Sequence, residues 1–226
     1  MVAKALVLGG GGVTGIAWEI GILAGLAEQG LDLADADVVI GTSAGSVVGV
    51  DVRSGAADVR RRVIESRLPT FEWPAGQLKI TAVDAATGRF AIFDSASGVR
   101  LVDAVDAVGA SCAVPGTWPP VTIDGRRYID GGMRSAANAD LAAGCERIVV
   151  IAPLVQGFGN LESVASQVRR LGEQGAQVTV IKPDKAAVAA IGRNVLDPAH
   201  RPEAARAGFT QAASEAADIR AVWSGS

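Results

Sequence analysis

The stretch that decides the fold is VVIGTSAGSVV, residues 38–48. An apolar run leads into the pattern Gly-x-Ser-x-Gly, and small and apolar residues typical of a helix follow. In that context the pattern is that of a nucleophile elbow, a tight strand-to-helix turn that holds its serine in a strained backbone conformation. Gly41 and Gly45 let strand and helix pass close together, and the Ser43 hydroxyl stands exposed at the helix N-terminus, where the dipole favours negative charge. A Gly-Ser turn with no catalytic role fits the same sequence pattern. Whether Ser43 is catalytic therefore depends on motifs elsewhere in the chain.

The composition limits the kinds of protein that this chain can be. The chain has 226 residues, of which 49% are hydrophobic and 20% charged, so it can form an ordinary globular core, and we expect one domain over residues 1–226. Its net charge is −3 and it has no long basic run, which argues against nucleic-acid binding as the main role. Heavy use of alanine, valine, glycine and arginine, with little lysine, suggests a GC-rich bacterial genome.

The sequence gives no sign of export or membrane insertion. The apolar run in residues 1–8 stops at Gly9 without a cleavage-like tail, so we interpret it as the first strand rather than a secretory signal. No apolar run reaches the roughly 18 residues needed to span a bilayer. Cys112 and Cys145 have no metal or redox spacing, which suggests a reducing compartment. We therefore expect a soluble, cytoplasmic protein, with a transient contact at a membrane surface left open.

Strand patterns alternate with helical patterns along the chain. Strands are expected at residues 3–8, 37–40, 79–83, 89–93, 147–151 and 177–182, and in a hairpin over 121–130. Helices are expected at residues 14–29, 44–53, 56–67, 101–110 and 161–174, and through most of the remainder. This alternation, broken only by two hairpins, predicts an α/β fold, namely a three-layer α/β/α sandwich with a mainly parallel central sheet.

A run of four glycines, residues 9–12, lies between the first strand and the first helix. With Gly15 it satisfies Gly-x-Gly-x-x-Gly, but a dinucleotide site calls for an acidic residue at the end of the second strand. The chain has residues 41–43, Gly-Thr-Ser, at that place, and Asp35 and Asp37 lie at the strand's other end. A dinucleotide site is therefore the weaker interpretation.

The favoured interpretation of the glycine run is an oxyanion hole. The backbone amides of Gly10, Gly11 and Gly12 would be unpaired and sterically open, and one such donor typically contributes about 3 kcal/mol to the transition state of acyl transfer. Both loops follow strands of a parallel sheet at their carboxyl ends, so the amides and Ser43 are expected on the same edge.

Two residues compete as the proton acceptor for the serine. The order Ser43, Asp130, His200 copies that of the α/β-hydrolases, but the single histidine lies between two prolines in an expected surface loop. Asp130 is the better candidate because it follows a strand and precedes two glycines, so a tight turn can present its carboxylate. An Asx-turn at a strand end explains the same residues, and the sequence leaves these two interpretations of Asp130 open.

Three motifs stand in order, namely GGGVTG at 10–15, GTSAG at 41–45 and DGG at 130–132. Together with SCAVPGTWPP at 111–120, they resemble the patatin-like phospholipase family over roughly residues 4–155. The resemblance implies an α/β/α sandwich and a Ser–Asp dyad that uses neither histidine nor metal nor cofactor. It also implies hydrolysis of lipid acyl esters.

Carried over to this chain, the resemblance makes Ser43 the nucleophile and Asp130 the base, with the oxyanion hole at Gly10, Gly11 and Gly12. Two departures stand out. The family commonly has Arg or Lys where this chain has Thr14, and residues 51–72 leave room for little lid or cap.

The leading hypothesis is a serine acyl hydrolase that cleaves carboxylic esters of lipids through an acyl-enzyme. A non-catalytic lipid- or acyl-binding protein on the same scaffold is the second hypothesis, and a nucleotide-binding protein is the third. Four aromatic residues near the proposed site are candidates for an acyl channel, although core packing is the commoner role for each. They are Trp18, Phe71, Trp73 and Trp118.

Overall fold

The computed structural model describes residues 3–53, 73–74, 76–94, 104–155 and 161–225. The helix expected over 56–67 and Phe71 lie outside these residues. The same holds for the expected short lid region beyond residue 53.

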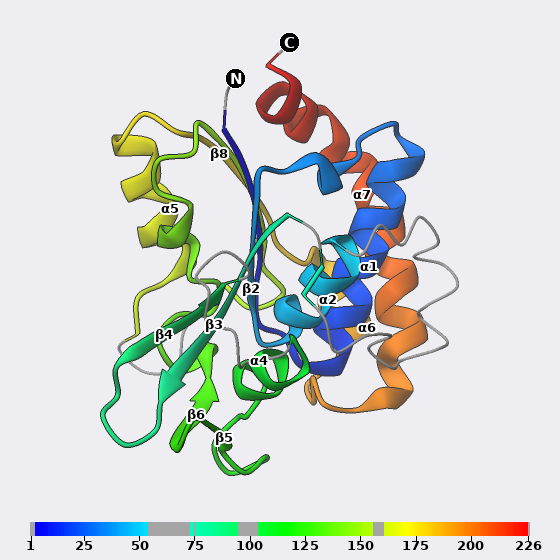
Figure 1. Cartoon of the computed structure of the whole chain (residues 1–226). Coiled ribbons are helices and arrows are strands. Elements are labelled where there is room, and N and C mark those ends of the chain that lie inside the picture. Colours follow the sequence, from blue (N-terminus) through cyan, green and yellow to red (C-terminus); the bar gives the residue numbers. More distant parts are fainter. Residues whose placement is uncertain (1–2, 54–72, 75, 95–103, 156–160, 226) are drawn as a thin grey trace.

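An eight-stranded mixed sheet forms the middle layer, in the order β5-β6-β3-β2-β1-β7-β8 with β4 also paired to β3 (Figure 1). The strands are β1 Lys4–Leu8, β2 Val38–Thr42, β3 Gln77–Asp84, β4 Phe90–Asp94, β5 Val121–Ile123, β6 Arg126–Asp130, β7 Arg147–Ile151 and β8 Gln177–Ile181. Strands β3, β2, β1, β7 and β8 pair in parallel. Strands β4, β6 and β5 add antiparallel pairs at one end, as the two expected hairpins require.

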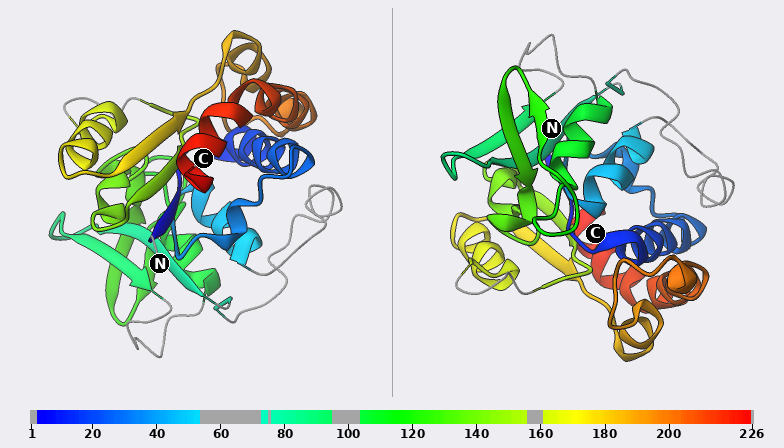
Figure 2. Two further views of the ribbon diagram at one scale, coloured as in Figure 1. Left: turned by 90° about the horizontal axis from the view of Figure 1, so that it is seen from above. Right: turned by 90° about the horizontal axis from the view of Figure 1, so that it is seen from below.

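Helices cover both faces of the sheet, so the predicted three-layer α/β/α arrangement is confirmed (Figures 1 and 2). One face carries α1 Gly12–Glu28, α2 Ala44–Arg53, α4 Ala104–Ser111, α6 Lys185–Ile191 and α7 Arg201–Ser224. The other carries α5 Val164–Glu173 and the 3-10 helix η3 Ala139–Ala142. Three further 3-10 helices are η1 Leu33–Asp35, η2 Gly131–Met133 and η4 Pro198–His200. None of the helices in the described residues is long and apolar enough to cross a membrane.

Strands β1, β2 and β7 are buried along almost their whole length because both faces of the sheet are covered there. In β1, Leu6 and Leu8 enter the core shared with α1 and α7, while Ala5 and Val7 enter the core shared with α5. This period of two fixes which way each residue at a strand end points.

Element boundaries differ from the expected ones by a few residues. Helix α1 begins at Gly12 rather than at residue 14, and Gly12 has a φ of +62°, which a glycine adopts at little cost. Helix α5 begins at Val164 rather than at residue 161 because the Ser163 side chain accepts a hydrogen bond from the Ser166 amide at 3.2 Å, which caps the helix.

Candidate active site

The turn between β2 and α2 has the geometry of a nucleophile elbow. Ser43 has a φ of +52°, in the left-handed region that residues other than glycine seldom adopt. A Cβ added at Gly41 would lie 2.6 Å from the Ser46 Cα, and one added at Gly45 would overlap the Leu8 backbone of β1. The predicted close approach is therefore confirmed, and at Gly45 the neighbour is β1 rather than β2.

Hydrogen bonds from several elements fix this turn. The Ser43 amide donates to the Ser111 Oγ at 2.9 Å, and the Ser46 hydroxyl donates to the Ser43 carbonyl at 2.6 Å. The Gly45 amide donates to the Gly9 carbonyl at 2.9 Å, which ties α2 to the glycine run. Sequence reasoning missed Ser111, whose only signal was its place at the start of the motif over 111–120.

The register of the sheet brings Asp130 to the elbow. Strands β2 and β6 pair with the same edge of β3, since β4 occupies the other edge. Thr42, the last residue of β2, lies opposite Thr81, and Asp130, the last residue of β6, lies opposite Ala82. The two strands run toward each other along β3 and end at adjacent positions, so Ser43 and Asp130 are neighbours.

Asp130 is held in a tight turn and faces the serine. Its Oδ1 accepts a hydrogen bond from the Gly132 amide at 2.6 Å, so the expected Asx-type turn is present. Burial raises the pKa of the Asp130 carboxyl, and interactions with the Ser43 side chain and the Gly132 amide act in the opposite direction. The turn and the contact with Ser43 occur together, so the two interpretations of Asp130 are compatible.

The glycine run provides fewer free donors than expected. The Gly10 amide donates to the Ala136 carbonyl at 2.7 Å, so the expectation of an unpaired amide is wrong for Gly10. The amides of Gly11 and Gly12 donate to no acceptor within the part of the chain that the structure describes. Sequence reasoning could not foresee this difference because Ala136 belongs to a loop 126 positions away, with no motif of its own.

Thr14 binds the segment around Val195, which forms part of the pocket wall. The Thr14 amide and hydroxyl both donate to the Val195 carbonyl, at 3.1 and 3.2 Å. A Cβ added at Gly12 would lie 2.6 Å from the same carbonyl oxygen. The segment around Val195 therefore closes tightly over the start of α1.

Ser43, Asp130 and residues 10–12 of the glycine run all line one pocket of about 430 Å³. Its other lining residues are mostly apolar; they are Val13, Ile16, Ala44, Cys112, Val114, Trp118, Gly132, Met133, Ala136, Leu154, Val195 and Leu196. Ser43 is only 8% exposed, so its hydroxyl lies in this recess rather than on an open surface. Such a mainly apolar hollow with a few convergent polar groups is typical of a small-molecule or acyl-binding site.

The aromatic candidates for an acyl channel that the structure describes lie in different parts of the molecule. Trp118 lines the pocket and is 59% exposed. Trp18 is buried in the core and donates its ring N–H to Gln211 at 3.3 Å, and Trp73 packs against the same core. Only Trp118 among the three described residues therefore reaches the pocket.

Cys112 forms part of the pocket wall without being poised as a nucleophile. Its Sγ lies 3.8 Å from the Ser46 Oγ. Burial, followed by the charge of Asp130, raises the pKa of the Cys112 thiol to about 12. A thiol with that pKa is protonated at neutral pH and reacts poorly.

The residues that a histidine base or a dinucleotide site would require lie away from the pocket. His200 is exposed in η4 and does not line the pocket. Asp35 binds the Lys4 ammonium at 2.9 Å and the Trp223 ring N–H at 2.7 Å, away from the glycine run. No group of three or more His, Cys, Asp or Glu side chains gathers within the described residues.

Comparison with known proteins agrees with this geometry. Residues 51–143 match the family model described as Patatin-like phospholipase. The chain resembles this family over that stretch. The fold is also similar to that of VipD from Legionella pneumophila, with a TM-score of 0.54 and 11% sequence identity over 96% of this chain and 67% of that one.

The family match and the site overlap in part. The matched residues include the Asp130-Gly131-Gly132 turn, while Ser43 and the glycine run precede them. The family consists in general of lipid acyl hydrolases.

Proposed function

We propose that this protein is a serine acyl hydrolase that cleaves carboxylic esters of lipids. The observation that carries the proposal is the meeting of Ser43 and Asp130 in an apolar pocket, beside the unpaired amides of Gly11 and Gly12. A strained serine, a facing carboxyl and open backbone donors are the three parts that acyl transfer requires.

The chemistry follows from these positions. The Ser43 hydroxyl attacks the ester carbonyl while the ionised Asp130 carboxylate accepts its proton. The amides of Gly11 and Gly12 donate to the oxyanion of the tetrahedral intermediate. Asp130 then returns the proton to the leaving alcohol, which leaves the acyl group on Ser43. A water molecule then gives a proton to Asp130 and attacks the acyl carbonyl. The bond to the Ser43 oxygen breaks, the carboxylic acid leaves, and Asp130 returns the proton to Ser43.

The pocket supports a lipid as the source of the acyl group. Apolar side chains form most of its wall, so an acyl chain would be desolvated as it enters. Trp118 is largely exposed where it lines the pocket, and a tryptophan so placed can contact a lipid surface. Transfer of the substrate from a membrane or micelle surface would then need little exposure of the chain to water.

A fluorophosphonate probe tests the proposal. The probe should form one adduct, mapped by peptide mass spectrometry to Ser43, and Ser43→Ala should abolish it. Ser214→Ala, which removes a serine hydroxyl from α7, should label like the wild type. A panel of esters of increasing chain length then reports which acyl groups are hydrolysed.

The same experiment separates the competing hypotheses. A binding-only protein would bind fatty acids and show no adduct at Ser43, and that result would overturn the proposal. A nucleotide-binding protein would gain thermal stability with millimolar NAD(P) or ATP, because a ligand that binds the folded state stabilises it.

A further inference from the structure

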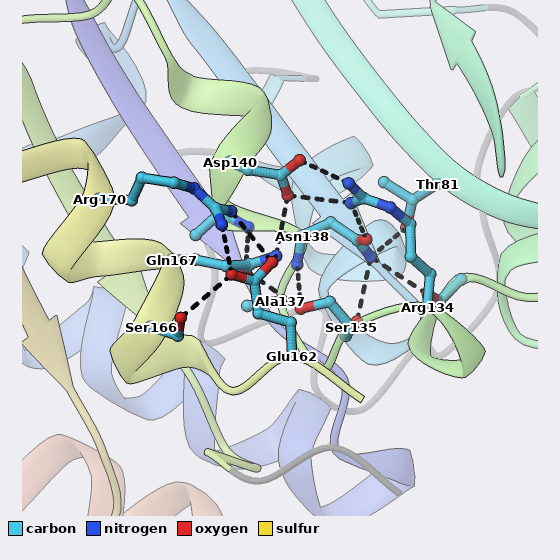
Figure 3. A network of polar contacts seen from close by, with 12 residues as sticks. Thr81, Arg134, Ser135, Ala137, Asn138, Asp140, Glu162, Ser166, Gln167 and Arg170 are labelled. Atoms are coloured by element: carbon cyan, nitrogen blue, oxygen red, sulfur yellow. Dashed lines mark hydrogen bonds and ion pairs between the residues drawn. The ribbon is translucent and has the colours of Figure 1, made fainter. Parts of the chain in front are cut away.

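A network of buried polar side chains lies on the α5 face of the sheet, outside the pocket (Figure 3). Strand alternation places Thr42 and Thr81 on this face, since Ile40 of the same strand packs in the core shared with α5. Asn138 lies at the centre of the network and is fully buried.

The Asn138 amide nitrogen contacts both turns of the proposed dyad. Its Nδ2 donates to the Thr42 Oγ1 at 3.1 Å and to the Gly131 carbonyl at 3.2 Å. Thr42 directly precedes Ser43, and Gly131 directly follows Asp130. The same nitrogen also reaches the Thr81 Oγ1 at 3.3 Å and the Ser135 carbonyl at 3.1 Å.

The orientation of this amide is set from the outer side of the network. The Asn138 Oδ1 accepts from the Arg134 Nη1 at 2.7 Å, which leaves the Nδ2 to point inward. Arg134 is held in turn by a bidentate pair with Asp140, at 2.9 and 2.6 Å. A planar guanidinium locked by a carboxylate is a rigid support.

The position favours asparagine over other residues. Asn138 has a φ of +50°, a left-handed conformation that asparagine tolerates better than most side chains. Thr81 completes the bridge, since its hydroxyl donates to the Thr42 Oγ1 at 2.9 Å.

Resting on the function proposed above, we propose that Asn138 is a positioning residue that sets the separation of Ser43 and Asp130. The two turns come from strands that end head to head and share no covalent link near the site. Asn138 ties the residue before the nucleophile to the residue after the base, so its loss would let the two turns shift apart. A displacement of about 1 Å between reacting groups can reduce a rate by about 100-fold.

The test compares two substitutions within the network with the substitution of a buried amide outside it. Asn138→Gly keeps the left-handed backbone and removes every contact of the side chain, and Thr81→Val removes only the bridging hydroxyl. Gln211→Ala is the matched control, because Gln211 is a buried amide in α7 that binds Trp18 and the Lys182 carbonyl and touches neither turn. The measurements are the melting temperature, kcat and KM on a chromogenic ester, and the rate of fluorophosphonate labelling at Ser43.

We expect Asn138→Gly and Thr81→Val to lower kcat and the labelling rate by about 10- to 100-fold with KM little changed. Gln211→Ala should lower the melting temperature to a similar extent and leave both rates near wild type. Rates within twofold of wild type in both Asn138→Gly and Thr81→Val would overturn the proposal, as would an equal loss of rate in Gln211→Ala.

A second measurement does not depend on hydrolysis. In a Ser43→Cys background, the pH midpoint of alkylation at residue 43, followed by mass spectrometry, reports how close the thiol lies to Asp130. A nearby carboxylate raises a thiol pKa. Addition of Asn138→Gly should therefore lower the midpoint, and an unchanged midpoint would overturn the positioning role. Should the wild type take no probe, the proposed function fails, and this midpoint alone decides the role of Asn138.

Discussion

Two buried polar regions meet at the ends of β2 and β6, and they differ in how fully their hydrogen bonds are formed. On the α5 face, the Asn138 amide uses both its oxygen and its nitrogen, and it binds the chain beside each turn. In the pocket, the amides of Gly11 and Gly12 have no acceptor among the described residues, and the buried Asp130 has a raised pKa. Under the proposed function, the region with satisfied hydrogen bonds would fix the geometry of the dyad, and the region with open donors would bind the substrate and react.

The sharpest test of these two roles is the ionisation of Asp130. Because burial raises the pKa of its carboxyl, activity that needs the carboxylate should fall as the pH drops through a midpoint above 3.8, the ordinary value for Asp. Asp130→Asn should lower kcat/KM by about 10²- to 10⁴-fold, the usual contribution of a general base. The pH–rate profile of an ester substrate measures both effects.

Asp124→Asn provides the control for this change. Asp124 lies at the turn of the same β5–β6 hairpin and is exposed, so its substitution should leave the profile unchanged. An Asp130→Asn variant that hydrolyses esters at the wild-type rate would show that the Asp130 carboxyl has no part in catalysis.

A smaller effect is expected at the glycine run. Gly12→Ala should slow ester hydrolysis by about 100-fold, because the new Cβ would lie 2.6 Å from the Val195 oxygen and displace an unpaired donor. Gly30→Ala is the matched control, since Gly30 also has a positive φ, of +73°, but has open space around its Cβ position. Kinetics and melting temperatures of the two variants separate loss of the donor from backbone strain, and equal kinetics in both would count against the oxyanion role.

The pocket side of this comparison was largely predictable from the sequence. Gly41, Ser43 and Gly45 form a local motif between a strand pattern and a helix pattern, so the strained turn could be foreseen, although its contacts with Leu8, Gly9 and Ser111 could not. The alternation of strands and helices was likewise local, and it predicted the three layers. Asp130 could be proposed because two glycines follow it at the end of a strand.

The network side was not predictable in the same way. Asn138 acts through contacts with Thr42 and Thr81, which lie 96 and 57 positions away in the chain. No periodicity or spacing encodes those contacts; they arise because β2 and β6 end against the same edge of β3. The Gly10 amide was misjudged for the same reason, since its acceptor, Ala136, comes from the loop that the network holds.

Glu19 lies outside the pocket, and it tests whether every buried polar group that lacks hydrogen bonds contributes to activity. It is fully buried in α1, and neither carboxylate oxygen has a hydrogen-bond partner within the described residues. Burial raises its pKa well above 4.5, and the Gly9 amide, already bonded to the Ile151 carbonyl, offsets this only in part. Glu19 does not line the pocket, so Glu19→Gln should keep full activity.

The same substitution should stabilise the fold at neutral pH. In the wild type, the stability contributed by protonated Glu19 is complete below its unfolded pKa and is lost as the pH rises through its higher folded pKa. Glutamine is neutral throughout, so Glu19→Gln should raise the melting temperature at pH 7 by a few degrees and leave it unchanged near pH 4. Thermal unfolding at the two pH values measures this, and lost activity would extend the functional region beyond the pocket.

The smallest effect is expected at His200, and it bears on which base serves Ser43. The histidine is exposed on η4, while Val195 and Leu196 of the preceding loop reach the pocket wall. His200→Ala should therefore change ester hydrolysis by no more than about twofold, as surface substitutions usually do. The loop is tied to α1 through Thr14, so a modest change in KM alone would mean that the substitution has shifted the pocket wall. A loss of kcat comparable to that of Asp130→Asn would instead show that the site is a triad that includes His200. Steady-state kinetics distinguish the two outcomes, since the first changes KM and the second changes kcat.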